Sequence, residues 1–348
     1  MLCNCPLYAA DIQTALDNVP RLFRLRGKRV MVVGAAGLMG SFLVDMLLAF
    51  NRTRQGDVDI LAVDSDGERL RARFAADERL HLLAQNIMQP LSSDLAADFI
   101  IHAASHAYPA AFARDPVGTM GGNLFGTYHL LQHAYDVGAE RFLLVSSGEV
   151  YGQGEPSAGG FVETDSGYVN PTAVRSCYPI SKRAAETLCV SFTQQYGLET
   201  VIVRPCHTYG PTATDKDNRA NVQFVNNAVA GEDIVLQSLG AQRRSYCYVA
   251  DGAAAILTVL LGGKSGEAYN IANAAAVTTV RGFAEAVARE TGVRVCFSQP
   301  DAAASAQQTA ISYAVLDSRK LGALGWRGQY TVEEGVRQTV RILQEIRG

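Results

Sequence analysis

The sequence of 348 residues has no long apolar run. Its longest apolar stretches, such as the one from Phe42 to Phe50, are interrupted by Asp45 and fall short of the roughly 20 residues that a membrane-spanning helix needs. The N-terminal segment also lacks the basic stretch followed by an apolar one that marks a secretory signal peptide. We therefore expect no membrane partner and a cytoplasmic location.

Basic clusters and a cysteine framework are missing as well. No run of Lys and Arg exceeds three residues and the formal net charge is −3, so we expect no nucleic-acid partner. Of the seven scattered cysteines only Cys3 and Cys5 are close together, and no second pair or nearby histidine completes a zinc site. An odd number without regular spacing is typical of reduced intracellular thiols, and we expect no metal.

What the sequence does have, from residue 28 onward, is an alternation of strand and helix patterns. Continuous apolar, β-branched runs predict strands covered on both faces, which are typical of a parallel sheet. The predicted strands are 29–34, 59–64, 98–104, 141–147 and 200–205. The predicted helices are 38–50, 115–137 and 177–196.

The pattern changes after residue 205. A polar loop at 210–221 is followed by shorter strand signals at 233–237, 244–249 and 267–273, and by helices after Asp251, at 281–291 and at 331–346. We expect an α/β fold in which residues 1–204 form a Rossmann-type doubly wound parallel sheet. Residues 205–348 are expected to form mainly a smaller C-terminal lobe, with some segments returning to the sheet.

A glycine-rich turn joins the first predicted strand to its helix. Gly34, Gly37 and Gly40 stand where the backbone must turn tightly and approach a pyrophosphate without a Cβ in the way. The helix that follows offers free N–H groups and partial positive charge. The next strand ends at Asp64, whose carboxylate is expected to accept both ribose hydroxyls and to repel a 2′-phosphate. No arginine follows directly, so the sequence favours NAD over NADP.

Tyr178 and Lys182 stand four residues apart at the start of the helix at 177–196, so both side chains lie on one face. A free tyrosine ionises near pH ~10. We expect the neighbouring ammonium and a bound nicotinamide ring to bring the pKa of Tyr178 towards working pH. Ser147 ends a predicted strand, where this fold presents residues to ligands. The order of these motifs predicts an acid/base site beside a dinucleotide.

Together the motifs resemble those of the extended short-chain dehydrogenase/reductase family, specifically its nucleotide-sugar epimerases, dehydratases and decarboxylases. The resemblance implies that Tyr178 takes a proton from a sugar C4 hydroxyl while NAD accepts hydride, that Ser147 hydrogen-bonds the sugar oxygen, and that Lys182 holds the nicotinamide ribose. Besides the glycine turn and the Tyr/Lys pair, it rests on HAAS (102–105), NLFGT (123–127), SSGEVYG (146–152), RPCHTYGP (204–211) and RRSYCYVADG (243–252).

The resemblance implies further contacts in a cofactor domain over 1–204 and a nucleotide-sugar-binding lobe over 205–348. Arg244 matches the arginine that reaches the nucleotide diphosphate, and its planar fork suits phosphate. The other substrate contacts are Ser105, Ser147, His207 and Arg219. The other cofactor contacts, besides Gly34, Gly37, Gly40, Asp64, Tyr178 and Lys182, are Leu38, Met39, Asn86, Ile87, Ala103, Ala104 and Asn123. Family members commonly dimerise through helices near 115–137 and 177–196, so we expect a homodimer.

Within the family, the sequence is most similar to UDP-glucuronate decarboxylases. Glu149 matches the glutamate that decarboxylases and 4,6-dehydratases place beside the sugar, where it acts on C5. Three residues depart from family patterns: Gly148 stands where one type of dehydratase has an aspartate as general acid, His207 replaces an asparagine, and Asn86 replaces an acid near the adenine. The segments that are similar to those of UDP-glucuronate decarboxylases are 85–91, 169–189 and 217–225.

The sequence thus predicts an NAD-dependent lyase of polysaccharide biosynthesis, which oxidises a nucleotide sugar transiently at C4 and then decarboxylates or dehydrates it. A 4-epimerase, in which the keto sugar turns over before it is reduced again, is the alternative. A scaffold with a dead site would not need the set Ser147, Tyr178 and Lys182. An alcohol dehydrogenase that exchanges free cofactor would leave RRSYCYV and RPCHTYGP unexplained.

Overall fold

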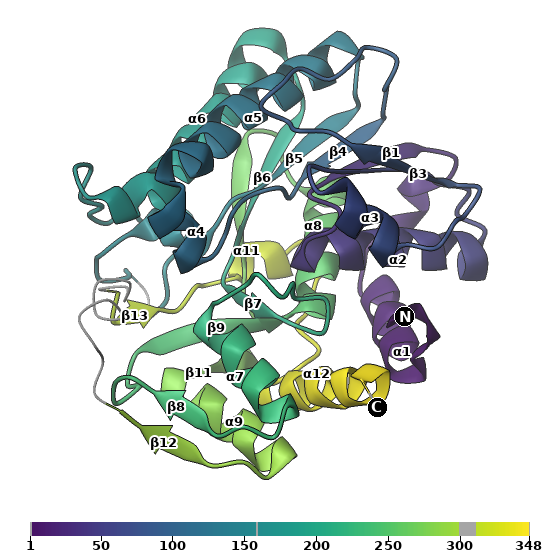
Figure 1. The fold of residues 1–348 in the computed structure, drawn as a ribbon. Coiled ribbons are helices and arrows are strands. Elements are labelled where there is room, and N and C mark those ends of the chain that lie inside the picture. The colour runs from purple at the N-terminus through teal and green to yellow at the C-terminus, as the bar shows by residue number, and fades with distance from the viewer. Residues whose placement is uncertain (1, 158, 299–310, 348) are drawn as a thin grey trace.

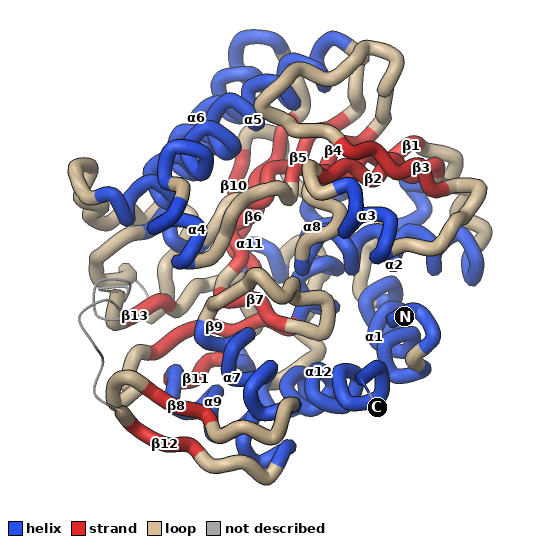
Figure 2. The backbone as a smooth tube through the Cα atoms, in the orientation of Figure 1, coloured by secondary structure: helices blue, strands red, loops and turns tan. Residues whose placement is uncertain are grey.

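The computed structural model describes residues 2–157, 159–298 and 311–347. Its centre is a seven-stranded parallel sheet with helices on both faces (Figures 1 and 2). The strand order β10-β6-β5-β4-β1-β2-β3 reverses its direction of growth between β1 and β4, which is the point where doubly wound folds bind their ligands. The expected Rossmann-type fold is therefore confirmed.

Five of the seven strands coincide with the five strands predicted first, and β10 with the shorter signal at 267–273. The edge strand β3 lies outside every prediction because its LHLLA segment is short and mostly exposed. The strands are β1 (Arg29–Val33), β2 (Asp59–Asp64), β3 (Leu80–Ala84), β4 (Phe99–His102), β5 (Arg141–Val145), β6 (Thr200–Pro205) and β10 (Glu267–Ile271).

Two helix layers enclose the sheet. Helices α5 (Pro116–Asp136) and α6 (Cys177–Tyr196), with bounds close to those predicted, cover one face. On the other face, α2 (Leu38–Arg54) lies beside α8 (Val249–Gly262), in which every residue from Val249 to Leu261 is buried. Removal of so much apolar surface from water supplies the main driving force for this packing. Although α8 and β10 come from the second half of the sequence, both belong to the layers around the sheet.

The remaining chain after β6 builds a second lobe, below the sheet in Figure 1. Its small sheet consists of β7 (His207–Tyr209), β9 (Arg243–Tyr248), β11 (Val277–Thr279) and β13 (Tyr313–Ala314), and all three other strands pair with β9. A separate pair consists of β8 (Ile234–Leu236) and β12 (Val295–Phe297). The helices of this lobe are α7 (Ala220–Val229), α9 (Val280–Thr291) and α12 (Val332–Arg347).

The other α-helices of the described chain are α1 (Pro6–Asp17), α3 (Gly67–Arg73), α4 (Pro109–Arg114) and α11 (Arg319–Gly322). Helix α1 lies against α2, α8 and α12, so the N-terminal segment fastens the sheet layers to the second lobe. Within the described ranges, no helix combines the length and the apolar character needed to cross a bilayer.

Candidate active site

A cavity of about 760 Å³ lies between the carboxyl ends of the sheet strands and the second lobe. Its volume is within the range of small-molecule binding sites. The sheet side contributes the glycine turn at 37–40 together with Ser147, Glu149 and Tyr178, and the second lobe contributes His207, Arg219 and Arg244. Residues far apart in the sequence thus meet around one space.

The glycine turn between β1 and α2 has no room for side chains. Gly34 has a φ of +84°, and a Cβ there would stand 2.6 Å from the backbone of Ala104. At Gly40 a Cβ would stand only 2.1 Å from the carbonyl oxygen of Gly34. Helix α2 starts at Leu38, and within the described chain no side chain caps its N-terminus. This cradle with its free N–H groups fits the diphosphate of a dinucleotide.

Asp64, at the end of β2, is turned towards the glycine turn. Its carboxylate accepts hydrogen bonds from the N–H groups of Ala36 and Asp66, both at 3.0 Å. Arg69 of α3 lines the cavity, and its Nη2 lies 3.6 Å from Asp64 Oδ1. No arginine follows Asp64 directly in the sequence, but α3 brings Arg69, five positions further along the chain, back to this carboxylate.

The other expected cofactor contacts fall into two groups. Leu38, Met39 and Ala103 line the cavity. Asn86 is exposed, and Ile87 is buried against α5, so both lie away from the cavity lining. The side chain of Asn86 accepts a hydrogen bond from the N–H of Met88 and thereby shapes its own turn.

Asn123 acts behind the cavity wall. Its side chain accepts a hydrogen bond from the Ser105 hydroxyl at 2.8 Å and donates one to Ser181 Oγ at 3.0 Å. Ser181 in turn donates to the carbonyl of Cys177 in the first turn of α6. This chain of contacts connects Ser105, in the loop after β4, with the helix that carries Tyr178.

Three polar residues of α6, each four positions after the last, face the strand ends. Tyr178 lines the cavity. One turn later, Lys182 Nζ donates to the carbonyl of Val145 at 2.9 Å, and two turns later Glu186 accepts from the Ser146 hydroxyl at 2.5 Å. These contacts fix α6 against Val145 and Ser146. Because Ser147 directly follows Ser146, they also fix the position of Tyr178 relative to Ser147.

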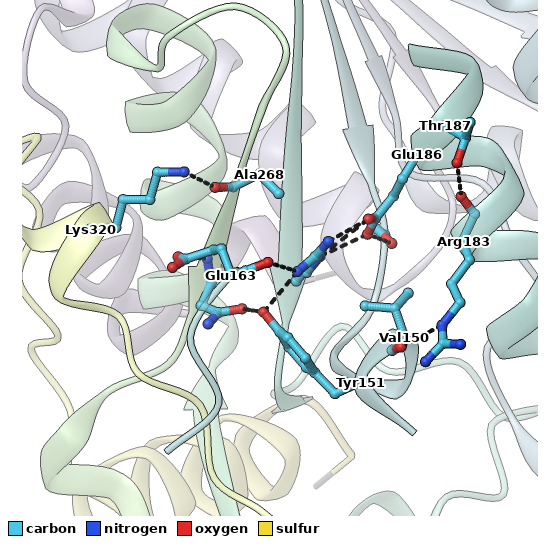
Figure 3. Close-up of polar contacts among 11 residues, drawn as sticks. Val150, Tyr151, Glu163, Arg183, Glu186, Thr187, Ala268 and Lys320 are labelled. Carbon is cyan, nitrogen blue, oxygen red and sulfur yellow. Dashed lines mark hydrogen bonds and ion pairs between the residues drawn. The ribbon is translucent and has the colours of Figure 1, made fainter. Parts of the chain in front are cut away.

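Glu186 also belongs to a buried polar network, drawn in Figure 3. Arg204 donates to Glu186 at 2.7 Å, to the hydroxyl of Tyr151 at 3.0 Å and to the carbonyl of Glu163 at 2.8 Å. Loss of one partner would leave a charge buried without compensation, which is strongly destabilising. The sequence analysis did not predict a role for Glu186, although its spacing from Lys182 places both residues on one helix face.

Tyr178 is 5% exposed and stacks on Phe112, with ring centroids 4.7 Å apart. Burial, reinforced by the charge of Glu149, raises the pKa of Tyr178 to about 12, and a hydrogen bond with Ser147 opposes this rise. Burial lowers the pKa of Lys182 to about 8. The protein's own groups thus shift Tyr178 opposite to the expected direction, because Lys182 points to a carbonyl and lies 6.0 Å from the ring centroid.

Glu149 stands beside Tyr178 in the short turn after Ser147. Its Oε1 accepts a hydrogen bond from Arg175 Nη2 at 2.9 Å. A Cβ added at the neighbouring Gly148 would stand 3.2 Å from Leu316 Cδ1 and 3.4 Å from the carbonyl oxygen of Pro205. A longer acidic side chain at Gly148 would therefore require Leu316 to move.

In the second lobe, His207 of β7 and Arg244 of β9 lie side by side, and Arg244 Nη1 is hydrogen-bonded to His207 Nε2. Arg219, just before α7, forms a two-point ion pair with Asp217 at 2.6 and 3.0 Å. Burial and the charges of both arginines hold the pKa of His207 well below its usual value. His207 is therefore neutral at physiological pH.

Three histidines outside the second lobe, His102, His129 and His133, make structural contacts. The rings of His129 and His133 hydrogen-bond to different carbonyls, those of Ile87 and Leu95. His102 is fully buried against the Thr127 hydroxyl, and burial lowers its pKa to about 3. The described residues contain no group of three or more His, Cys, Asp or Glu side chains arranged to hold a metal ion.

The polar loop between Gly210 and Arg219 crosses the cavity. Thr212 donates to the carbonyl of Leu38 at 2.8 Å, Asn218 accepts from the N–H of Ala110 at 3.2 Å, and Lys216 lies 3.4 Å from Asp66. Several residues of the loop, from Thr214 to Arg219, line the cavity. No local sequence pattern predicts the contacts of this loop to the sheet side, because they depend on tertiary packing. The same holds for the contacts of Phe112.

Fold and cavity together define a dinucleotide-binding α/β enzyme, and comparison with known proteins gives its family. The model of the NAD dependent epimerase/dehydratase family matches residues 30–272. The chain belongs to this family, and NAD is its cofactor. The predicted family, fold, enzymatic character and cofactor are thereby confirmed.

Individual relatives agree with this assignment. UDP-glucuronic acid decarboxylase 6 from Arabidopsis thaliana is 36% identical over 252 residues, which cover 72% of this chain and 71% of the relative. UDP-glucuronic acid decarboxylase 5 from the same plant is 36% identical over 279 residues, or 78% and 80% of the two chains. The dTDP-glucose 4,6-dehydratase DesIV from Streptomyces venezuelae, solved with NAD bound, is 27% identical, with a TM-score of 0.78 over 92% of this chain and 98% of that one.

Proposed function

We propose that the protein oxidises a nucleotide sugar at C4, removes the C6 carboxyl group as carbon dioxide and reduces the ketone again, as a UDP-glucuronate decarboxylase does. The similarity to plant UDP-glucuronic acid decarboxylases supports the substrate class. The observation that carries the choice of reaction is the packing at Gly148, whose neighbourhood is filled by Leu316 and the Pro205 carbonyl.

This packing favours decarboxylation over dehydration. Elimination of water from C5 and C6 expels a hydroxyl group, which leaves readily only when an acid protonates it. A C4 ketone instead makes the C6 carboxylate a β-keto acid: the C5–C6 bond breaks, its electron pair moves towards the C4 oxygen, and carbon dioxide leaves without protonation. Because Gly148 offers no acid, the second route suits the site better.

The chain's own residues then have separate tasks. Tyr178 removes the proton of the C4 hydroxyl and later returns it, and Ser147 hydrogen-bonds the same oxygen. Glu149, oriented by Arg175, delivers the proton that C5 needs after carbon dioxide has left. Lys182 and the glycine turn would hold NAD, which would supply the hydride acceptor and donor for C4.

Incubation with UDP-glucuronate, UDP-glucose and dTDP-glucose, followed by mass spectrometry, tests the proposal. We expect UDP-glucuronate to lose carbon dioxide without added cofactor, because NAD is regenerated in each turnover. Loss of water from a hexose substrate would indicate a dehydratase, and isomerisation without a change of mass would indicate the 4-epimerase. Either result would overturn the proposal.

The Glu149→Gln variant examines the middle step. It keeps a hydrogen-bond acceptor for Arg175 but cannot transfer a proton. We expect the variant to make product slowly and to release a C4-keto pentose derivative. Unchanged turnover would show that another group supplies the proton to C5.

We also propose the cellular form of the enzyme as a cytoplasmic homodimer, with a cofactor domain over 1–204 and a substrate lobe mainly over 205–348. Leu130, Leu131 and Phe192 of α5 and α6 are buried in the core of the single chain and are not free to form a dimer contact. The apolar side chains that these helices expose instead are Val117, Met120, Phe125, Tyr128, Tyr135, Val190 and Tyr196. Sedimentation of Phe125→Glu against the natural protein tests this interface.

A further inference from the structure

Four half-buried arginines line the cavity in the described part of the chain, and three of them lie against a carboxylate. Arg69 is 3.6 Å from Asp64, Arg175 is 2.9 Å from Glu149, and Arg219 is 2.6 Å from Asp217. Among the described residues, no carboxylate lies within ion-pair distance of Arg244. The partner of its guanidinium is the imidazole of His207.

This partner is neutral. An arginine can only donate, so His207 Nε2 must be the acceptor, and the ring proton sits on Nδ1. The flanking charges of Arg244 and Arg219, together with burial, keep the pKa of His207 well below its usual value. The imidazole therefore orients the guanidinium without cancelling its positive charge.

We infer that His207 is a positioning residue that holds Arg244, the arginine that the family resemblance implies for the diphosphate, through a neutral contact and without an ion-paired carboxylate. Arg244 then contributes more to binding the diphosphate of a nucleoside diphosphate than Arg219 or Arg175 does. The inference rests on the proposed function, and it assigns unequal roles to cations that line the same cavity. An anion that approaches Arg219 must first compete with Asp217. An anion that approaches Arg244 displaces no other anion.

The supporting strands place the two side chains next to each other. His207 lies opposite Tyr246 in the β7–β9 pairing, two positions along β9 from Arg244. Both residues line the cavity, and the His207 and Tyr246 rings are 5.8 Å apart. A half-buried, oriented cation of this kind binds phosphate more strongly than a cation in water, since the surroundings screen less of its charge.

The test changes the charge of the acceptor. His207→Asp gives Arg244 a carboxylate like those of the other arginines, and His207→Asn retains a neutral acceptor. By calorimetry with UDP, we expect His207→Asp to lose roughly tenfold or more in affinity, and His207→Asn less than about threefold. His106→Asp, which adds the same charge to an exposed position in the same cavity, is the matched control and should lose much less.

Uridine and UMP locate the effect. His207→Asp should weaken UDP binding more than UMP binding, leave uridine binding and NAD content unchanged, and raise KM more than it lowers kcat. A loss that is equal for UDP and uridine, or equal in His207→Asp and His207→Asn, would overturn the inference. If the natural protein binds none of UDP, dTDP, GDP and CDP, the proposed function fails instead. If the protein binds UDP but His207→Asp does not weaken this binding, the inference fails while the proposed function stands.

Discussion

The two walls of the cavity hold their functional side chains in different ways. The sheet wall, which includes Ser147 and Tyr178, is fixed through buried contacts to strand ends, such as the bond from Lys182, one helical turn after Tyr178, to the Val145 carbonyl. The lobe wall, formed by His207, Arg219 and Arg244, is fixed by contacts of charged and polar side chains with one another. The first arrangement suits proton and hydride transfer, which needs a constant geometry, and the second suits recognition, where small changes of charge alter affinity.

The largest difference between the walls should be seen when Tyr178 is replaced by Phe. The stacking on Phe112 is kept, but the proton acceptor is lost, so we expect turnover to fall about 10³-fold. UDP affinity should stay within about twofold, because the lobe wall is untouched. The absorbance of NADH formed in a single turnover measures the first effect, and calorimetry with UDP measures the second. Substantial turnover by Tyr178→Phe would remove this residue from the acid/base role.

Arg244→Gln should have the opposite profile. We expect nucleotide affinity to fall by roughly 10- to 100-fold, since a charge-assisted contact to phosphate is lost, with a smaller effect on the chemical step at saturation. Arg219→Gln is the matched control, and it should lose less because Asp217 already compensates this charge. Equal losses in the two variants would contradict the difference between these arginines.

The same contrast describes what the sequence could and could not predict. Continuous apolar strands, a glycine turn that admits no Cβ and helix faces of period 3.6 are local signals, so β1, α6, Tyr178 and Lys182 were predictable. The partners of the polar groups were not. Arg69 reaches Asp64 through the start of α3, Phe112 reaches Tyr178 from another helix, and these contacts depend on packing between segments without a common motif.

The contribution of the protein's own groups to the pKa of Tyr178 could not be predicted for the same reason. The spacing of Lys182 suggests a nearby positive charge, which would lower the pKa. In the structure burial dominates, and the ammonium points to the Val145 carbonyl. Sequence spacing places two residues on one helix face, but the solvent access and hydrogen bonds that set a pKa follow from the complete fold.

A smaller effect concerns the stability of the folded protein in acid, through His102 at the end of β4. His102 has a pKa of about 3 in the folded protein, against about 6.5 when unfolded, so only the unfolded chain binds its proton between these values. Stability should therefore fall as pH drops below about 6.5, with this group contributing about 2 kcal/mol of loss at pH 5 relative to pH 7.

Urea unfolding of the natural protein and of His102→Gln at both pH values, at a fixed NAD concentration, measures this contribution. We expect the variant to have the weaker pH dependence, whatever its absolute stability. His207 contributes in the same direction, since its pKa is also depressed, and it remains present in both proteins. An unchanged pH dependence would mean that His102 does not titrate on unfolding.

The smallest effect is expected where the two walls meet. Lys216, in the loop that crosses from the lobe, pairs with Asp66 next to the end of β2, and both side chains are solvated. Exposed ion pairs contribute little and are screened by salt, so Lys216→Met should speed the release of NAD by no more than a few-fold, and only at low ionic strength. Thr212→Val removes the buried contact of the same loop to the Leu38 carbonyl and should release NAD faster than Lys216→Met does. If Lys216→Met had the larger effect, or one that persisted in high salt, the loop would be held by its charge rather than by its buried hydrogen bond, and the walls would be joined electrostatically.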